Sequence, residues 1–404
     1  MKIKSKPVVF FLILLLILLP LSSNQALADS VIANINLPAK AGPLGIDANS
    51  ANSRLVVADN FINQFSVIDG TANSLVGSFS SGSNPYGVLF DSANSNFYVA
   101  NNVGNTISVI NGATNTVIQT INLPINSNPT MLAFNSANGR IFSANNGDNT
   151  VSVIDGTTNA IVSTIVLPPG SSPTAIVYDS SNGFIYVADN AANAVTVING
   201  ATNSVIQNIP LPIGSGPIGI AFDLLNGCIY VSNFGNSKVS VINGSTNNVI
   251  SVIPVGSGPA GIAFDLSNGN LYVTNNNDNT ISVINGNTNT VIQTIPLPIN
   301  AGPVIPIFHP VNHDIYVTDI GTSQVSVIRS SFSLPSPSLS FTSVTATSAT
   351  LSWTSVPGAT SYTLFRSISS SGPFTPIQAG LISTTFTDTT LSPSTTYFYQ
   401  VTAV

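Results

Sequence analysis

Short apolar runs rich in Val, Ile, Tyr and Thr alternate with turns rich in Gly, Asn and Pro over residues 31–329. The stretch Gly258–Leu297 shows this pattern in one unit, and none of its apolar runs follows a helical period. We therefore expect four short β-strands in it. They are Gly261–Phe264, Leu271–Thr274, Ile281–Ile284 and Val291–Ile295. Some runs are apolar on both faces, which predicts sheets that are covered on both sides.

The unit repeats along the chain. Its third and fourth strands are joined by the hairpin sequence SVI-Asn/Asp-Gly, which recurs every 42 or 44 residues. The glycines are Gly70, Gly112, Gly156, Gly200, Gly244 and Gly286. A period in the low forties is the length of one four-stranded propeller blade. We expect each Asn-Gly pair to supply the positive φ angle that a tight strand reversal needs.

The two ends of the repeat region complement each other. Each unit opens on a proline, at Pro43, Pro85, Pro129, Pro173, Pro217, Pro259 and Pro303. The segment Val31–Leu37 precedes the first of them and resembles the fourth strand of a unit. The seventh unit has only three strands, predicted at Val304–Phe308, Asp314–Thr318 and Gln324–Ile328. We therefore predict an all-β fold: a seven-bladed β-propeller of four-stranded blades, closed by the N-terminal strand.

The chain begins with the features of a secretory signal peptide, predicted over residues 1–28. Three lysines precede the apolar run Val8–Leu21, and Ala26–Ala28 forms a small-residue cleavage box. The alternative is an uncleaved membrane anchor, but Pro20 interrupts the run, which is shorter than a span of about 20 residues. We expect a secreted or cell-surface protein with no membrane span after cleavage. The propeller is assigned to residues 29–332.

Composition excludes a nucleic-acid partner. Beyond residue 28 there are six basic residues against 15 acidic ones, all Asp, so the charge is about −9. No basic stripe could neutralise phosphates. No phosphate-binding loop, Walker lysine or dinucleotide-binding motif occurs, and no cofactor is expected. The lone cysteine, Cys228, is expected to be a small buried residue.

The ends of the second strands carry a family resemblance. YVANN (98–102), YVADN (186–190), YVSN (230–233), YVTNN (272–276) and YVTD (316–319) resemble the YVTN-type β-propeller repeat. The resemblance covers about residues 31–329. It implies the propeller fold and a surface-layer or secreted protein. Similar propellers also include lactonase-like enzymes, a streptogramin-type lyase and quinoprotein subunits, so the fold leaves the function open.

A second pattern follows a linker predicted at residues 333–337. Residues 338–404 resemble a fibronectin type III module, a β-sandwich in which Trp353 would be the core tryptophan and Tyr397 the tyrosine-corner residue. The sequence stops where the sixth strand should end, so this module is expected to lack its last strand. Such modules are commonly spacers or adhesive units.

One polar position recurs after every second strand. It is occupied by Asp59, Asn101, Asn145, Asp189, Asn233, Asn275 and Asp319. Propeller geometry would gather these side chains on one face around the central channel, where they could bind a cation or a sugar-like ligand. The alternative, which we favour, is that each side chain bonds the backbone of its own loop.

Few residues could carry catalysis. The only histidines, His309 and His313, replace Asp265 and Gly269 of the preceding unit. They could bind a metal with a third ligand such as Asp314, but their spacing on a turn favours drift in a solvent-exposed loop. A Ser-His-Asp set would have to form around one of them.

Three classes of function remain open. We favour a structural or interaction protein that presents a propeller face to an extracellular or envelope protein or glycan. The alternatives are a secreted enzyme of lactonase or lyase type and a glycan or small-ligand binding module. The same residues recur in every unit, whereas an enzyme should concentrate unusual polar residues in a few blades.

Overall fold

The computed structural model describes residues 16–18, 28–330, 337–356, 359 and 361–403. The chain divides into two compact units, Ala28–Ser330 and a second one formed by Ser331–Val404 with the first 27 residues. Most of the predicted signal peptide, and residues 333–336 of the predicted linker, lie outside the described residues. Where the chain is described, no helix is long and apolar enough to cross a membrane.

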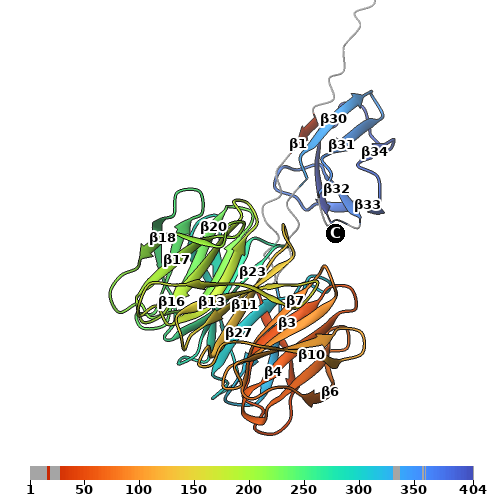
Figure 1. Ribbon diagram of the computed structural model, residues 1–404. Coiled ribbons are helices and arrows are strands. Elements are labelled where there is room, and N and C mark those ends of the chain that lie inside the picture. Colours follow the sequence, from red (N-terminus) through yellow and green to blue (C-terminus); the bar gives the residue numbers. More distant parts are fainter. Residues whose placement is uncertain (1–15, 19–27, 331–336, 357–358, 360, 404) are drawn as a thin grey trace, which may run out of the picture. The chain divides into compact units, whose positions relative to one another are not determined.

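Unit Ala28–Ser330 consists of seven four-stranded antiparallel sheets, the arrangement of a β-propeller (Figure 1). The first sheet contains β3 (Pro43–Asn49), β4 (Arg54–Asp59), β5 (Gln64–Asp69) and β6 (Ser74–Ser80), with the 3-10 turn η1 (Asn60–Ile62) after β4. The second contains β7 (Pro85–Asp91), β8 (Asn96–Asn101), β9 (Thr106–Asn111) and β10 (Thr116–Asn122). The third contains β11 (Pro129–Asn135), β12 (Arg140–Asn145), β13 (Thr150–Asp155) and β14 (Ile161–Val166).

The remaining sheets follow the same order. The fourth contains β15 (Pro173–Asp179), β16 (Phe184–Asp189), β17 (Ala194–Asn199) and β18 (Ser204–Pro210). The fifth contains β19 (Pro217–Asp223), β20 (Cys228–Asn233), β21 (Lys238–Asn243) and β22 (Asn248–Pro254). The sixth contains β23 (Pro259–Asp265), β24 (Asn270–Asn275), β25 (Thr280–Asn285) and β26 (Thr290–Pro296). The strands predicted from Gly258–Leu297 are therefore present, each longer by one or two residues at each end.

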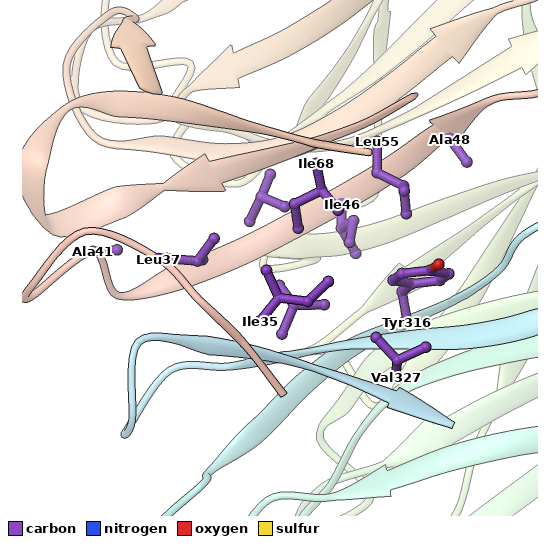
Figure 2. Close-up of a cluster of buried hydrophobic side chains, with 11 residues drawn as sticks. Ile35, Leu37, Ala41, Ile46, Ala48, Leu55, Ile68, Tyr316 and Val327 are labelled. Atoms are coloured by element: carbon purple, nitrogen blue, oxygen red, sulfur yellow. The ribbon is translucent and has the colours of Figure 1, made fainter. Parts of the chain in front are cut away.

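The seventh sheet joins the two ends of the unit. It contains β27 (Pro303–Phe308), β28 (Asp314–Asp319), β29 (Gln324–Arg329) and β2 (Ser30–Asn36), which pairs with β29 in antiparallel register. The first strands of successive sheets contact one another, and β27 contacts β3. Figure 2 shows Ile35 and Leu37 between residues of the first sheet, such as Leu55, and residues of the seventh, such as Val327. We call this junction of the seventh and first sheets the seam.

The hairpin glycines have a different role from the one expected. None of the six repeated hairpin glycines has a positive φ angle; in the same hairpins the left-handed residue is an asparagine, for example Asn289 with φ 55°. A Cβ at Gly286 would lie 2.5 Å from Asp223 of the fifth sheet and 2.7 Å from the carbonyl of Gly269. Glycine is needed because neighbouring sheets approach closely there, and the expectation of positive φ was wrong.

The tyrosine of the YVTN-like sequence links consecutive sheets. Tyr186 donates from its hydroxyl to the carbonyl of Gly244, at 3.2 Å, and to Asn247 Oδ1, at 2.7 Å, both in the hairpin of the next sheet. At the seam, Tyr316 donates in the same way to Gly70 and Asn73 of the first sheet. The repeated Tyr and Gly are therefore two halves of one contact between sheets.

Replacing Tyr316 by Phe should lower the free energy of unfolding by about 1–2 kcal/mol, because Asn73 Oδ1 loses its donor, whereas the carbonyl of Gly70 keeps the Asn312 side-chain amide. Phe142 fills the equivalent place in the third sheet, so the ring itself fits without a hydroxyl. The measurement is the urea midpoint at constant m-value. Tyr178→Phe is the control, since other sheets carry Phe at that position and a change within about 0.5 kcal/mol is expected. Equal effects of the two substitutions would contradict the role of Tyr316.

The second unit contains two further sheets. One has the order β30 (Leu339–Val344), β31 (Ala349–Trp353), β34 (Thr385–Asp388). The other has the order β1 (Leu16–Leu18), β35 (Tyr397–Ala403), β32 (Tyr362–Ser367), β33 (Thr375–Leu381), with β1 parallel to β35. Trp353 is buried and packs edge-on against Tyr362 in the common core, and the Tyr397 hydroxyl accepts a hydrogen bond from the Ser392 amide at 3.1 Å.

Candidate functional site

The seven Asp and Asn residues singled out in the sequence are the last residues of the second strands. Each lies opposite the proline that opens its own sheet, as Asp59 lies opposite Pro43 and Asp319 opposite Pro303. All seven side chains are fully buried. They are Asp59, Asn101, Asn145, Asp189, Asn233, Asn275 and Asp319.

A hydroxyl on the third strand of the same sheet is bonded to each of these side chains. Ser66 donates to Asp59 Oδ2 at 2.6 Å, and Thr196 donates to Asp189 Oδ2 at 2.5 Å. Where the residue is Asn, the amide donates instead, as Asn233 does to Ser240 at 2.8 Å. The expected partner was the loop backbone, but the main partner is a Ser or Thr across the strand pair. Each set therefore includes a bond within one sheet, and Asn101 also accepts from the Gly82 amide in the connection from the first sheet.

Burial changes the protonation of the three carboxyls in this set. It raises the pKa of Asp59 and of Asp319 to about 7, and that of Asp189 to about 6, against the opposing hydrogen bonds from Ser or Thr. Each has one oxygen, Oδ1, with no hydrogen-bond partner among the described residues. A buried carboxylate without full hydrogen bonding is unfavourable, so the neutral acid is favoured at mildly acidic pH.

The loops after these residues hold neighbouring sheets together, a contact that the sequence analysis missed. Asn60 donates from its side chain to the carbonyl of Pro85 at 2.9 Å, and Asn276 donates to Pro303 at 3.1 Å. Asn also follows the second strand in the second, third and fourth sheets. In the seventh sheet the residue is Ile320, which cannot make this bond. The signal was present in the sequence as an Asn that recurs at this position in five of the seven sheets, with Phe234 in the fifth and Ile320 in the seventh.

His309 acts as a turn residue. It is fully buried, and its Nδ1 accepts the amides of Val311 and Asn312, both at 3.3 Å. Asp265 does the same in the sixth sheet, where its Oδ1 accepts the amide of Ser267 at 2.8 Å. Burial lowers the pKa of His309, which favours a neutral ring. The expectation of a solvent-exposed turn is therefore wrong for this residue.

His313 takes a glycine position in the same turn. Its φ angle is 60°, close to the 73° of Gly269 in the sixth sheet. No group of three or more His, Cys, Asp or Glu side chains suited to a metal occurs in the part of the chain that the structure describes. The turn also lies at the opposite end of β28 from Asp319, so the histidines and the buried carboxyl do not share a site.

A cleft of 740 Å³ opens at the seam, close in sequence to Asp59 and Asp319. One wall is the connection between β2 and β3, a second is η1, and a third is the loop between β28 and β29. Its lining residues are Asn36, Leu37, Ala39, Lys40, Phe61, Ile62 and 320–323. The sequence analysis did not identify it, since its walls come from both ends of the repeat region.

Comparison with known proteins supports the fold. The family model that matches is the NHL repeat, over residues 257–284, and no curated protein matches the chain. A structure of streptogramin B lyase aligns with TM-score 0.66 and 20% identity, covering 76% of this chain and 99% of that one.

Two other solved structures give the same result. Virginiamycin B lyase from Staphylococcus aureus aligns with TM-score 0.65 and 18% identity, covering 75% of this chain and 99% of the lyase. Hydrazine synthase of Kuenenia stuttgartiensis has TM-score 0.65 and 16% identity, with 72% and 96% covered. At this identity the likeness concerns the propeller fold alone.

Proposed function

We propose that this chain is an exported, non-catalytic propeller that binds an extracellular or envelope partner through the loops at the proline end of its sheets. The observation that carries this proposal is the use of the repeated polar residues. The buried Asp and Asn side chains bond Ser or Thr of their own sheets, and His309 holds a turn. Side chains that make these structural hydrogen bonds are poorly placed to act as catalytic groups.

The loops at the proline end also favour an interaction role. Ile125, Ile213 and Ile299 occupy the same place in three connections between sheets and are 84%, 98% and 85% exposed. We propose these three protruding side chains as contacts for the partner. The partner proposed is a protein or glycan of the cell envelope or the extracellular space, in keeping with the signal-like sequence of residues 1–28.

We also propose the finer points of the architecture. The seven sheets form a closed ring, in which β2 supplies the outer strand of the seventh sheet; the contact of β27 with β3 supports this. The repeats are of the YVTN type, supported by the Tyr contacts between sheets. Residues 338–404 form a fibronectin type III-like module, supported by the buried Trp353 and the bonded hydroxyl of Tyr397.

A lyase-type enzyme is the second candidate, because two of the structures with the same fold are streptogramin-type lyases. Such chemistry would need a titratable group at an accessible site. Of the two histidines, His309 is fully buried and engaged by backbone amides, and the exposed His313 holds a left-handed turn position at the opposite end of β28 from the buried Asp319. This is the reason for preferring the interaction role.

The test is an assay of the purified protein against lactones and a cyclic depsipeptide. We expect no turnover above buffer. His309→Asp restores the residue found at this place in the fourth, fifth and sixth sheets, so the variant should fold and serve as a matched control. Turnover by the parent that disappears in this variant or in His313→Ala would replace the proposal with an enzyme.

A further inference from the structure

The seam cleft differs from every other junction in the repeat. The residue two places after the second strand is Phe61 in the first sheet, but Val103 or a smaller or polar residue in the other sheets. The residue directly after the second strand is Ile320 in the seventh sheet, whereas five of the other six sheets have Asn there. Because five of the other six sheets keep this Asn and none of the six has an aromatic residue at the second place, these departures distinguish the seam from the other junctions.

Lys40 is a third departure. It has φ 62°, a left-handed conformation, at a position where other connections of equal length have Asn126, Gly170, Gly214 and Asn300. Lysine is an unusual residue for this conformation, so its place in the turn is not explained by the backbone. It makes no ion pair among the residues that the structure describes, whereas Arg329 pairs with Asp314 and Arg366 with Asp388.

The walls of the cleft are held in place before anything binds. Leu37 donates from its amide to the carbonyl of Ser323 at 3.1 Å, and Phe61 donates to Ala41, also at 3.1 Å. The Phe61 side chain is 62% exposed, and the hydroxyl oxygen of Thr322 is buried without a partner within the described part of the chain. A preformed apolar surface beside one cation is typical of a small-molecule site.

We propose that the seam cleft binds a small amphipathic anion, a molecule with an aromatic or acyl body and one carboxylate or sulfonate group. The body lies against Phe61, Ile62 and Ile320. The anionic group lies at the ammonium of Lys40. The volume of 740 Å³ suits a molecule of this size. The chain is strongly acidic overall, so recognition of an anion must come from this local cation.

Two dyes that differ by one group provide the test. 1-Anilinonaphthalene-8-sulfonate has the proposed chemistry, and N-phenyl-1-naphthylamine is the same body without the sulfonate. We expect one sulfonate dye per chain, a Kd weakened about fivefold by Lys40→Met, and no change in the affinity for the neutral dye. Phe61→Ala should weaken both dyes, by about tenfold.

The repeat supplies matched controls. Lys238→Met removes the other lysine beyond residue 28, and Phe234→Ala removes the exposed aromatic that follows the second strand of the fifth sheet. Neither should change the affinity for either dye. Ile320→Asn restores the common repeat residue and should weaken both dyes while thermal stability is kept.

The thermal midpoint of each variant separates loss of the site from loss of the fold. The proposal fails if Lys40→Met and Lys238→Met give the same affinity for the sulfonate dye, or if Phe61→Ala and Phe234→Ala have equal effects. It also fails if the dye binds at many equivalent sites around the propeller.

Discussion

Deleting Val31–Leu37 should leave a protein that aggregates or melts well below the parent. Ile35 and Leu37 are 4% and 8% exposed and pack between the first and seventh sheets (Figure 2). Losing two such side chains costs about 5–10 kcal/mol, comparable with the whole stability of a typical domain. The deletion also exposes the edge of β29, which invites pairing with other chains. Differential scanning calorimetry and light scattering would measure both effects.

Two point substitutions test the buried side chains of β2 without removing the strand. Ile35→Ala should cost about 2–5 kcal/mol because it opens a cavity at the seam. Ile32→Ala is the matched control on the same strand, where the side chain is 40% exposed and the change should stay within about 0.5 kcal/mol. A peptide spanning residues 29–38 should restore part of the melting temperature of the deletion variant. An unchanged melting temperature in the deletion variant would refute the role assigned to β2.

Raising the pH from 4 to 8 should destabilise the propeller. In the folded protein the pKa is raised to about 7 for Asp59 and Asp319 and to about 6 for Asp189, mainly by burial, from an ordinary value of 3.8. Between these values the folded state holds more protons than the unfolded state, so stability falls as pH rises. A shift of about three units corresponds to about 4 kcal/mol for one group. The free energy of unfolding should fall between about pH 4 and pH 7 and change little above pH 7.

The repeat itself provides the variant that tests this. Asn stands at the same place in the second, third, fifth and sixth sheets, so replacing Asp59, Asp189 and Asp319 by Asn should keep the fold. The triple variant should melt higher than the parent at pH 8 and depend far less on pH. A smaller dependence of stability on pH should remain, because burial raises the pKa of Asp47 to about 6 and also raises the pKa of Asp91, Asp223 and Asp265. Asp278→Asn, an exposed residue, should not change the profile; a triple variant with the parent's pH profile would contradict this assignment.

The sequence by itself determined the strands, their grouping into seven units, and the pairing of β2 with β29 in the last unit. These features depend on local chemistry: alternating apolar runs, turn residues, and a period of 42 or 44 residues between hairpin glycines. Each is repeated several times, so one irregular copy does not obscure it.

Only the tertiary structure decided what the repeated residues contact. Gly286 is required by Asp223 of the preceding sheet, and the hydroxyl of Tyr316 reaches Gly70, 246 residues away. His309 was read as a surface residue, but the packing of its turn buries it. The seam cleft brings Lys40 and Phe61 beside Ile320. Local patterns specify strands because they act between near neighbours, whereas contacts between sheets depend on which elements the completed fold places side by side.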